Sequence, residues 1–90
     1  MPERSLVVAS AVGLHARPAA LFVRAAVATG LQVTVGRPDA EQVDARSILR
    51  VMSLGVKHGE SLVLRAEGAG ADEALDALVA MLEQDLDADV

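Results

Sequence analysis

The chain has 90 residues, of which 52% are hydrophobic and 23% are charged, and it contains no cysteine. This composition is typical of a folded chain with one modest core, and it excludes disulfide frameworks, zinc–thiolate sites and cysteine nucleophiles. Phe22 is the one aromatic residue, so there is no platform on which bases could stack, and the formal charge of −5 also disfavours nucleic acid as a partner. We therefore expect a single domain over residues 1–90.

Charge is distributed unevenly along the chain. Residues 1–65 hold all eight basic residues and five acidic ones, whereas residues 66–90 hold eight acidic residues and no basic one. This pattern indicates a mildly basic surface that attracts acidic partners and an acidic surface that favours solubility.

The uncharged run 5–14 is too short to span a bilayer, and Glu3 before it is atypical of a signal peptide. We expect a soluble, cytoplasmic protein without direct membrane insertion.

The first third of the chain predicts a strand followed by a helix. Residues 3–9 are short and rich in Val and Leu, which is typical of a strand. An Ala-rich segment then begins at Ala16, accommodates Pro18 in its first turn, and ends at Thr29–Gly30. Helical spacing predicts the core-facing residues of this helix to be Ala19, Phe22, Val23 and Ala26.

The middle of the chain predicts a strand, a turn, a short edge strand and a short helix. Leu31, Val33 and Val35 alternate with polar residues, as in a half-buried strand. Residues 36–39 read as a turn, and residues 41–44 as an edge strand. Ser47 is a good N-cap for a helix that ends near Leu54, with Gly55 as its stop.

The last third predicts a strand and a long helix. In residues 61–67, Leu62, Leu64 and Ala66 are expected on one side of the strand and Val63, Arg65 and Glu67 on the other. Asp72 and Glu73 open a helix whose predicted apolar stripe is Leu75, Leu78, Val79, Leu82 and Leu86. Acidic residues at Asp85, Asp87 and Asp89 disfavour its last turn, which we expect to fray. The element order βαββαβα favours a two-layer α/β (α+β) open-faced sandwich with an antiparallel sheet.

The strongest candidate for chemistry is the segment Gly13-Leu14-His15-Ala16-Arg17-Pro18, a loop that runs directly into a helix. A helix N-terminus offers unpaired N–H groups and a positive dipole end, which together bind anions, and the Arg17 guanidinium suits phosphate oxygens. The same dipole keeps the His15 imidazole neutral and nucleophilic, so a phosphoryl group on His15 would match every local charge. A plain capping or surface role for His15 is the alternative. Two histidines without cysteine predict no metal, and the sequence predicts no cofactor.

Two segments together resemble the HPr family, the phosphocarriers of the bacterial sugar phosphotransferase system. These are Gly13-Leu14-His15-Ala16-Arg17-Pro18-Ala19 and Arg46-Ser47-Ile48-Leu49-Arg50-Val51-Met52-Ser53-Leu54-Gly55-Val56. The resemblance covers essentially the whole chain. It implies a four-stranded sheet in the order 1-4-2-3 with three helices on one face.

The resemblance also implies a carrier role rather than a turnover enzyme. His15 would take a phosphoryl group from phosphorylated enzyme I, ultimately from phosphoenolpyruvate, and pass it to enzyme IIA proteins or domains. Arg17 and the backbone of Ala16 and Arg17 would steady the phosphate. Ser47 falls at the family's regulatory position, which a serine kinase phosphorylates in some bacterial groups; a purely structural N-cap is the alternative. We expect a monomer.

Helix geometry predicts the surface on which partners dock. Arg17, Leu21 and Arg24 share one face of the first helix, and Ile48 and Leu49 beside Arg50 form an apolar patch with positive charge. Core packing of Leu21, Ile48 and Leu49 is the alternative, as is a merely solvated role for Arg24 and Arg50. His58 is expected to be an exposed turn residue.

Three rival functions remain open. One is a docking-only regulatory module of the same fold, against which the presence of His15 argues. Another is a carrier for a non-sugar branch, in a dihydroxyacetone or nitrogen-related system. The third is an unrelated two-layer α/β module in which the His15 loop merely turns the chain.

Overall fold

A computed structural model describes residues 2–9 and 16–83. The elements follow the predicted order βαββαβα. Their bounds are β1 Glu3–Val7, α1 Ala16–Ala28, β2 Gln32–Gly36, β3 Val43–Asp44, α2 Ile48–Ser53, β4 Ser61–Glu67 and α3 Ala71–Leu82.

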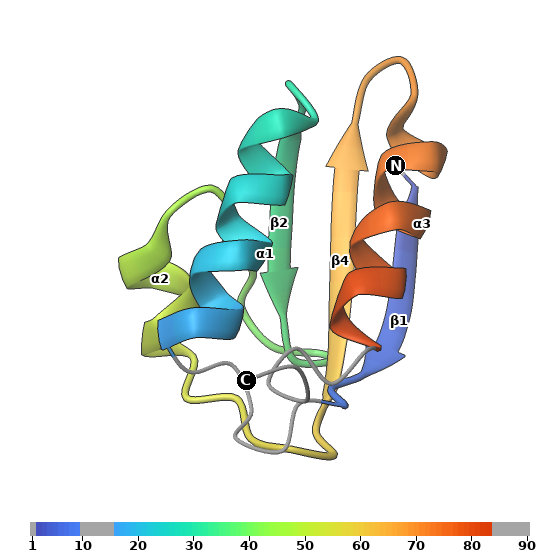
Figure 1. The fold of residues 1–90 in the computed structure, drawn as a ribbon. Helices are drawn as coiled ribbons and strands as arrows, with labels where there is room; N and C mark the ends of the chain where they lie inside the picture. The colour runs from blue at the N-terminus through green and yellow to red at the C-terminus, as the bar shows by residue number, and fades with distance from the viewer. Residues whose placement is uncertain (1, 10–15, 84–90) are drawn as a thin grey trace.

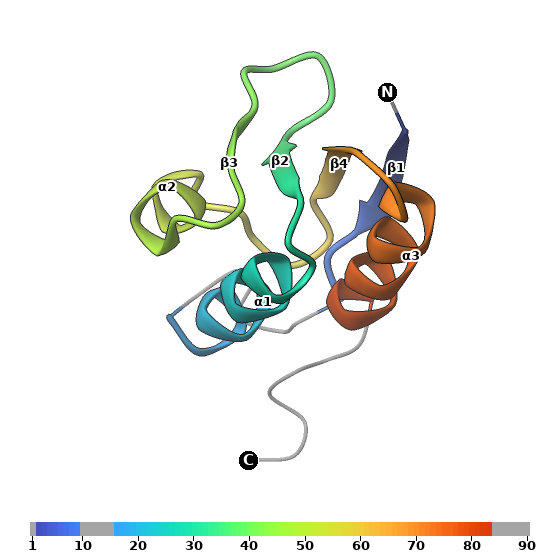
Figure 2. The ribbon, with the colours of Figure 1, turned by 90° about the horizontal axis from the view of Figure 1, so that it is seen from above.

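The four strands form one antiparallel sheet in the order β1-β4-β2-β3, so β4 and β2 are the central strands. Figure 1 shows β4 between β1 and β2. Leu6 pairs with Leu62 across β1 and β4, and Val33 pairs with Ala66 across β2 and β4. Seen from above, α1 and α3 lie side by side across one face of the sheet, and α2 packs beside α1 near β3 (Figure 2). The other face of the sheet is open. The predicted fold class and strand order are confirmed.

The core lies between the sheet and its helices, and local patterning explains its composition. Phe22 on α1 and Leu75 and Leu78 on α3 are fully buried, as helical spacing predicts. From the sheet, alternate residues of β2 and β4 supply the facing layer, namely Val33, Val35, Leu62, Leu64 and Ala66. Val23 of α1 is half-buried and packs against this core.

Several predicted strand boundaries are wrong by a few residues. The first strand ends at Val7 rather than Ala9, because the chain opposite it turns at Gly59, where φ is +83°; Val8 still donates a hydrogen bond to the Glu60 carbonyl. The edge strand β3 contains two residues instead of the predicted 41–44. Gly36, predicted as part of a turn, is the last residue of β2.

Val63 departs from the predicted alternation of β4. It lies on the open face, yet it is only 8% exposed. Its neighbour across β2 and β4 is Gly36, which has no side chain. Gln42 packs against Gly36 so closely that a Cβ there would lie 2.6 Å from the Gln42 Nε2. The segment before β3 therefore covers part of the open face.

The C-terminal helix α3 is tied to β1 through Arg4. The Arg4 guanidinium forms ion pairs with Asp72 at 3.0 Å and Asp76 at 2.9 Å, both in the N-terminal half of α3. The helix extends to Leu82, and the predicted stripe residue Leu86 and its acidic neighbours lie outside the described residues.

None of the helices in residues 2–9 and 16–83 has the length and hydropathy needed to span a membrane.

Candidate functional site

The predicted phosphate site lies at the start of α1. That helix begins at Ala16, immediately after His15, as the sequence predicts. His15 itself, with the rest of the loop 10–15, lies outside the described residues. Pro18 is buried in the first turn, where its missing N–H leaves no helical hydrogen bond unmade. The first N–H groups of a helix have no partner within the helix.

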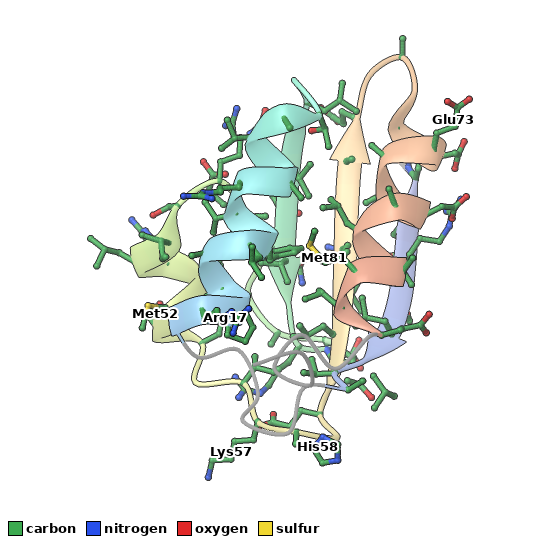
Figure 3. The ribbon with its side chains drawn as sticks, in the orientation of Figure 1. Arg17, Met52, Lys57, His58, Glu73 and Met81 are labelled. Carbon is green, nitrogen blue, oxygen red and sulfur yellow. The ribbon has the colours of Figure 1, made fainter. Side chains whose placement is uncertain are left out.

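Arg17 is exposed at this end of α1, so its guanidinium is accessible to a ligand (Figure 3). Lys57 and His58 lie at the same end of the molecule, in the segment that connects α2 to β4. His58 is an exposed turn residue, as predicted. Cationic groups from two segments therefore lie at the end of the molecule where α1 begins.

The predicted docking face of α1 has two exposed arginines and a half-buried leucine. Arg17 and Arg24 are exposed, whereas Phe22 and Ala26 on the opposite face are completely buried. Leu21 lies between these two environments and is half-buried rather than exposed. The two cations of α1 are thus the accessible part of this face.

Ser47 is the N-cap of α2, as the sequence predicts. Its backbone is extended, with φ −110° and ψ 115°, and its Oγ accepts a hydrogen bond from the Arg50 N–H at 3.4 Å. At the other end of α2, the N–H of Leu54 donates to the Val51 carbonyl, and Gly55 has a φ of +61°. This left-handed conformation favours glycine, which explains why the helix ends here.

The outer side of α2 carries three exposed apolar side chains, which we call the α2 patch: Ile48, Leu49 and Met52. Their exposed fractions are 39%, 80% and 41%, whereas Val51 is completely buried. The alternative of core packing is therefore wrong for Ile48 and Leu49. The sequence prediction did not single out Met52, although its position four residues after Ile48 places both on one helix face. The helices α1 and α2 pack together, and Figure 3 shows Met52 near the start of α1.

The two arginines nearest to Ser47 in the sequence, Arg46 and Arg50, differ in their surroundings. Arg46 forms an ion pair with Asp44, with Nε 3.1 Å from Oδ1. Hydrogen bonds from the Arg46 side chain, and then from its backbone N–H, hold the pKa of Asp44 below its ordinary value. The positive charge of Arg46 is thus partly balanced by Asp44, and Arg50 is an exposed cation on α2 itself.

A second arginine-centred contact lies at the far end of α2, and the sequence analysis missed it. Arg37, just after β2, binds Glu60, with Nε 2.6 Å from Oε2. It also donates from Nη1 to the Leu54 carbonyl at 2.7 Å and from Nη2 to the Gly55 carbonyl at 3.2 Å. These partners are 17 to 23 residues away in the sequence, so no local pattern predicts them.

In the part of the chain that the structure describes, no group of three or more His, Cys, Asp or Glu side chains is placed to hold a metal ion. The described site offers a helix N-terminus, an exposed guanidinium, and an exposed apolar patch with cations beside it. These suit an anionic group and a protein partner.

Comparison with known proteins identifies the family. The family model described as the PTS HPr component phosphorylation site matches residues 2–84. Phosphocarrier protein HPr of Streptomyces coelicolor is 46% identical over 87 residues, which cover 97% of this chain and 94% of that protein. A solved structure of HPr from Thermoanaerobacter tengcongensis has a TM-score of 0.85 and 44% identity, covering 92% of each chain. A second structure from that organism, described as an HPr dimer, has a TM-score of 0.70 and 44% identity over 92% of this chain and 94% of the other.

The match extends over nearly the whole length of the chain and agrees with its fold. The chain therefore belongs to the HPr family, the phosphocarrier proteins of the phosphotransferase system, which are not enzymes in their own right.

Proposed function

We propose that this phosphocarrier accepts its phosphoryl group on His15 from phosphorylated enzyme I, and donates it to enzyme IIA proteins or domains for sugar uptake. The observation that carries the proposal is the start of α1 at Ala16, directly after His15, with Arg17 exposed in the first turn. A phosphoryl group on His15 would meet the positive end of the helix, the N–H groups of Ala16 and Arg17, and the Arg17 guanidinium.

The strength of this site suits temporary storage of a phosphoryl group. A helix N-terminus stabilises an anion by about 0.3–1 kcal/mol at an exposed position, which favours the phosphorylated form without trapping it. Residues 4–38 contain no Asp or Glu, so the loop and α1 supply no carboxylate base that would activate water against the phosphohistidine. Partner proteins supply the remaining positioning and charge stabilisation for transfer.

The docking surface in this proposal combines the α2 patch with the neighbouring cations. Leu49 is the most exposed of the patch residues, and Arg50 follows it on the same helix. Arg17 and Arg24 extend the positive charge along α1, while Leu21 contributes its half-buried side chain at the edge. An apolar centre with a charged rim is the usual composition of a protein interface, and this rim selects acidic partners.

The test is phosphorylation with phosphoenolpyruvate and enzyme I. The protein should gain a single acid-labile phosphate, and His15→Ala should abolish it with the fold intact; labelling of the alanine variant would refute the assignment. Arg17→Glu should slow transfer far more than it lowers the thermal midpoint, because the exposed guanidinium acts on the phosphate rather than on packing. Equal effects on transfer and stability would instead indicate a structural role for Arg17.

We further propose that phosphorylation of Ser47 by a serine kinase regulates docking. A phosphoserine adds about −1.5 to −2 charges beside Arg50 and the α2 patch, which would repel acidic partners. Asp44 already pairs with Arg46, so the positive charge of Arg46 would offset the added negative charge only in part. Both points favour a switch that weakens the binding of acidic partners.

Two variants separate this role from the capping role of Ser47. Ser47→Ala should lower the free energy of unfolding by about 1 kcal/mol, because the N-cap hydrogen bond is lost, and should leave phosphoryl transfer nearly unchanged. Ser47→Asp keeps a capping oxygen and adds charge, so transfer from enzyme I should slow at unchanged stability. Normal transfer by the aspartate variant, measured beside the alanine variant, would contradict the regulatory role.

We also propose that the chain works as a cytoplasmic monomer, with residues 1–90 as one domain. The excess of acidic residues in its last quarter favours solubility, and a monomer leaves the exposed α2 patch accessible to partner proteins. Light scattering of the purified protein tests the monomer directly, since a stable dimer would double the measured mass.

A further inference from the structure

Burial alone anchors α2 weakly. The helix has six residues, and isolated helices shorter than about 12 residues are marginal in water. Val51 is its buried residue, while Ile48, Leu49 and Met52 leave much of their apolar surface exposed. Helices in proteins are normally stabilised by burying their apolar face, and a helix whose apolar side chains point outward lacks much of this stabilisation. Contacts at its ends must therefore contribute more than usual.

Arg37 supplies such contacts at the C-terminal end of α2. The last carbonyl groups of a helix have no partner within it, and a cation there also meets the negative end of the helix dipole. Arg37 donates to the carbonyls of Leu54 and Gly55, which follow the last helical residue, Ser53. Ser47 caps the N-terminal end, so polar contacts hold α2 at both ends.

Glu60 fixes the direction in which Arg37 points. The carboxylate accepts from Arg37 Nε at 2.6 Å and from Nη2 at 3.3 Å, which is a bidentate contact. Glu60 is itself anchored, because its Oε1 accepts the Lys57 N–H at 3.0 Å and its backbone carbonyl accepts the Val8 N–H at 3.0 Å. We name Arg37, Glu60 and the two carbonyls of Leu54 and Gly55 the Arg37 brace.

We propose that Arg37 is a positioning residue for phosphoryl transfer, because the Arg37 brace holds α2 in place and so orders the α2 patch before a partner docks. Arg37 follows β2 and Glu60 precedes β4, so the brace ties the end of α2 to the two central strands of the sheet. A patch that is already ordered binds without a further loss of conformational freedom. This inference rests on the proposed docking role of the α2 patch.

Amide hydrogen exchange tests the brace in the free protein. Arg37→Met keeps most of the aliphatic stem and removes the donors, so the Leu54 and Gly55 amides should exchange about tenfold faster. Arg65→Met is the matched control: Arg65 pairs with Glu3 between β4 and β1 at 3.0 Å, and its side chain is 43% exposed against 37% for Arg37. This control should leave exchange in α2 within about twofold of the unchanged protein.

Transfer kinetics test what the brace is for. With phosphorylated enzyme I, Arg37→Met should raise the KM for this protein by about three- to tenfold and leave kcat nearly unchanged, because docking is impaired and the phosphoacceptor is intact. The KM of Arg37→Lys should lie between those of the original protein and Arg37→Met. The lysine ammonium can pair with Glu60, but it cannot reproduce the planar guanidinium contacts to both carbonyls. Arg65→Met should keep the original KM.

The outcomes separate the brace from the docking surface. Unchanged exchange at the Leu54 and Gly55 amides in Arg37→Met overturns the proposal. The proposal is also overturned if these amides exchange faster in Arg37→Met and its KM is unchanged, while Leu49→Asp raises the KM. If Leu49→Asp and Arg37→Met both leave KM unchanged, the docking surface of the proposed function is wrong and the positioning role falls with it. A faster-exchanging α2 with a raised KM and a retained kcat supports the proposal.

Discussion

At the scale of single residues, arginine neighbours lower the pKa of two carboxylates among the residues that the structure describes. The pKa of Glu60 is lowered chiefly by the hydrogen bond from Arg37, and then by the Lys57 backbone N–H. The pKa of Asp44 is lowered by the side chain of Arg46 and then by its backbone N–H. A carboxylate with a lowered pKa in the folded state stabilises that state above its unfolded pKa, and this contribution is lost as the pH falls through the folded value.

Glu60→Gln should therefore be less stable than the original protein at pH 7, with a difference that shrinks on acidification below the ordinary glutamate value of 4.5. Urea unfolding at pH 7 and at about pH 3 measures the two differences. The double variant Arg37→Met/Glu60→Gln should show the same pH dependence as Glu60→Gln, because the lost interaction is shared. A difference that stays constant with pH would contradict this assignment.

At the scale of elements, close approach of the backbone decides how β2 ends and β3 begins. Gly36 closes β2 next to Val63 of the central strand. A Cβ on Gly36 would lie 2.6 Å from both the Glu41 carbonyl oxygen and the Gln42 Nε2. Glycine is thus required here by space rather than by a turn conformation, which is why the turn prediction was wrong at this position.

Gly36→Ala should lower the free energy of unfolding by about 1–3 kcal/mol, because the added methyl group forces the segment before β3 to move. Removing the Gln42 side chain in Gly36→Ala/Gln42→Ala should relieve only part of the loss, since the Glu41 carbonyl belongs to the backbone. Gln32→Ala, at an exposed position of the same strand, is the control and should cost well under 1 kcal/mol. Denaturant midpoints measure all three, and a Gly36→Ala variant as stable as the control would disprove the crowding.

At the scale of the whole molecule, charge is sorted between surfaces. The exposed cations Arg17, Arg24 and Arg50 lie on α1 and α2, two helices that pack together. The described part of α3 carries acidic residues in its first turn, and Arg4 pairs with two of the carboxylates on that helix. An acidic partner is therefore attracted toward α1 and α2 and away from α3, and electrostatic attraction of this kind acts mainly on the rate of association.

Arg24→Glu and Arg50→Glu should each slow association with enzyme I by about three- to tenfold at low salt, with a smaller effect at 0.5 M salt. Arg65→Glu changes the net charge equally, but Arg65 lies on β4, where it pairs with Glu3 of β1, so its effect should be clearly smaller. Stopped-flow or surface-binding rates at two ionic strengths make the comparison. If Arg65→Glu slows association as much as the other two, net charge rather than a defined surface is responsible.

Much of the fold and part of the candidate site could be predicted from the sequence because the relevant signals are local. The N-cap at Ser47 and the stop at Gly55 each depend on residues within one helical turn, and both predictions are confirmed. The start of α1 at Ala16 is equally local. The roles of His15 and Arg17 came from the motif that surrounds them, and they remain predictions that phosphorylation will test.

The sequence by itself determined the order of the elements and the family, since periodicity, capping residues and motifs act over a few neighbouring positions. The tertiary structure alone decided that Arg37 meets Glu60 and the end of α2, that Gln42 packs against Gly36, and that Val63 is covered on the open face. The physical reason is that each of these contacts depends on how the strands and helices come together in space. Spacing along the chain does not report that arrangement.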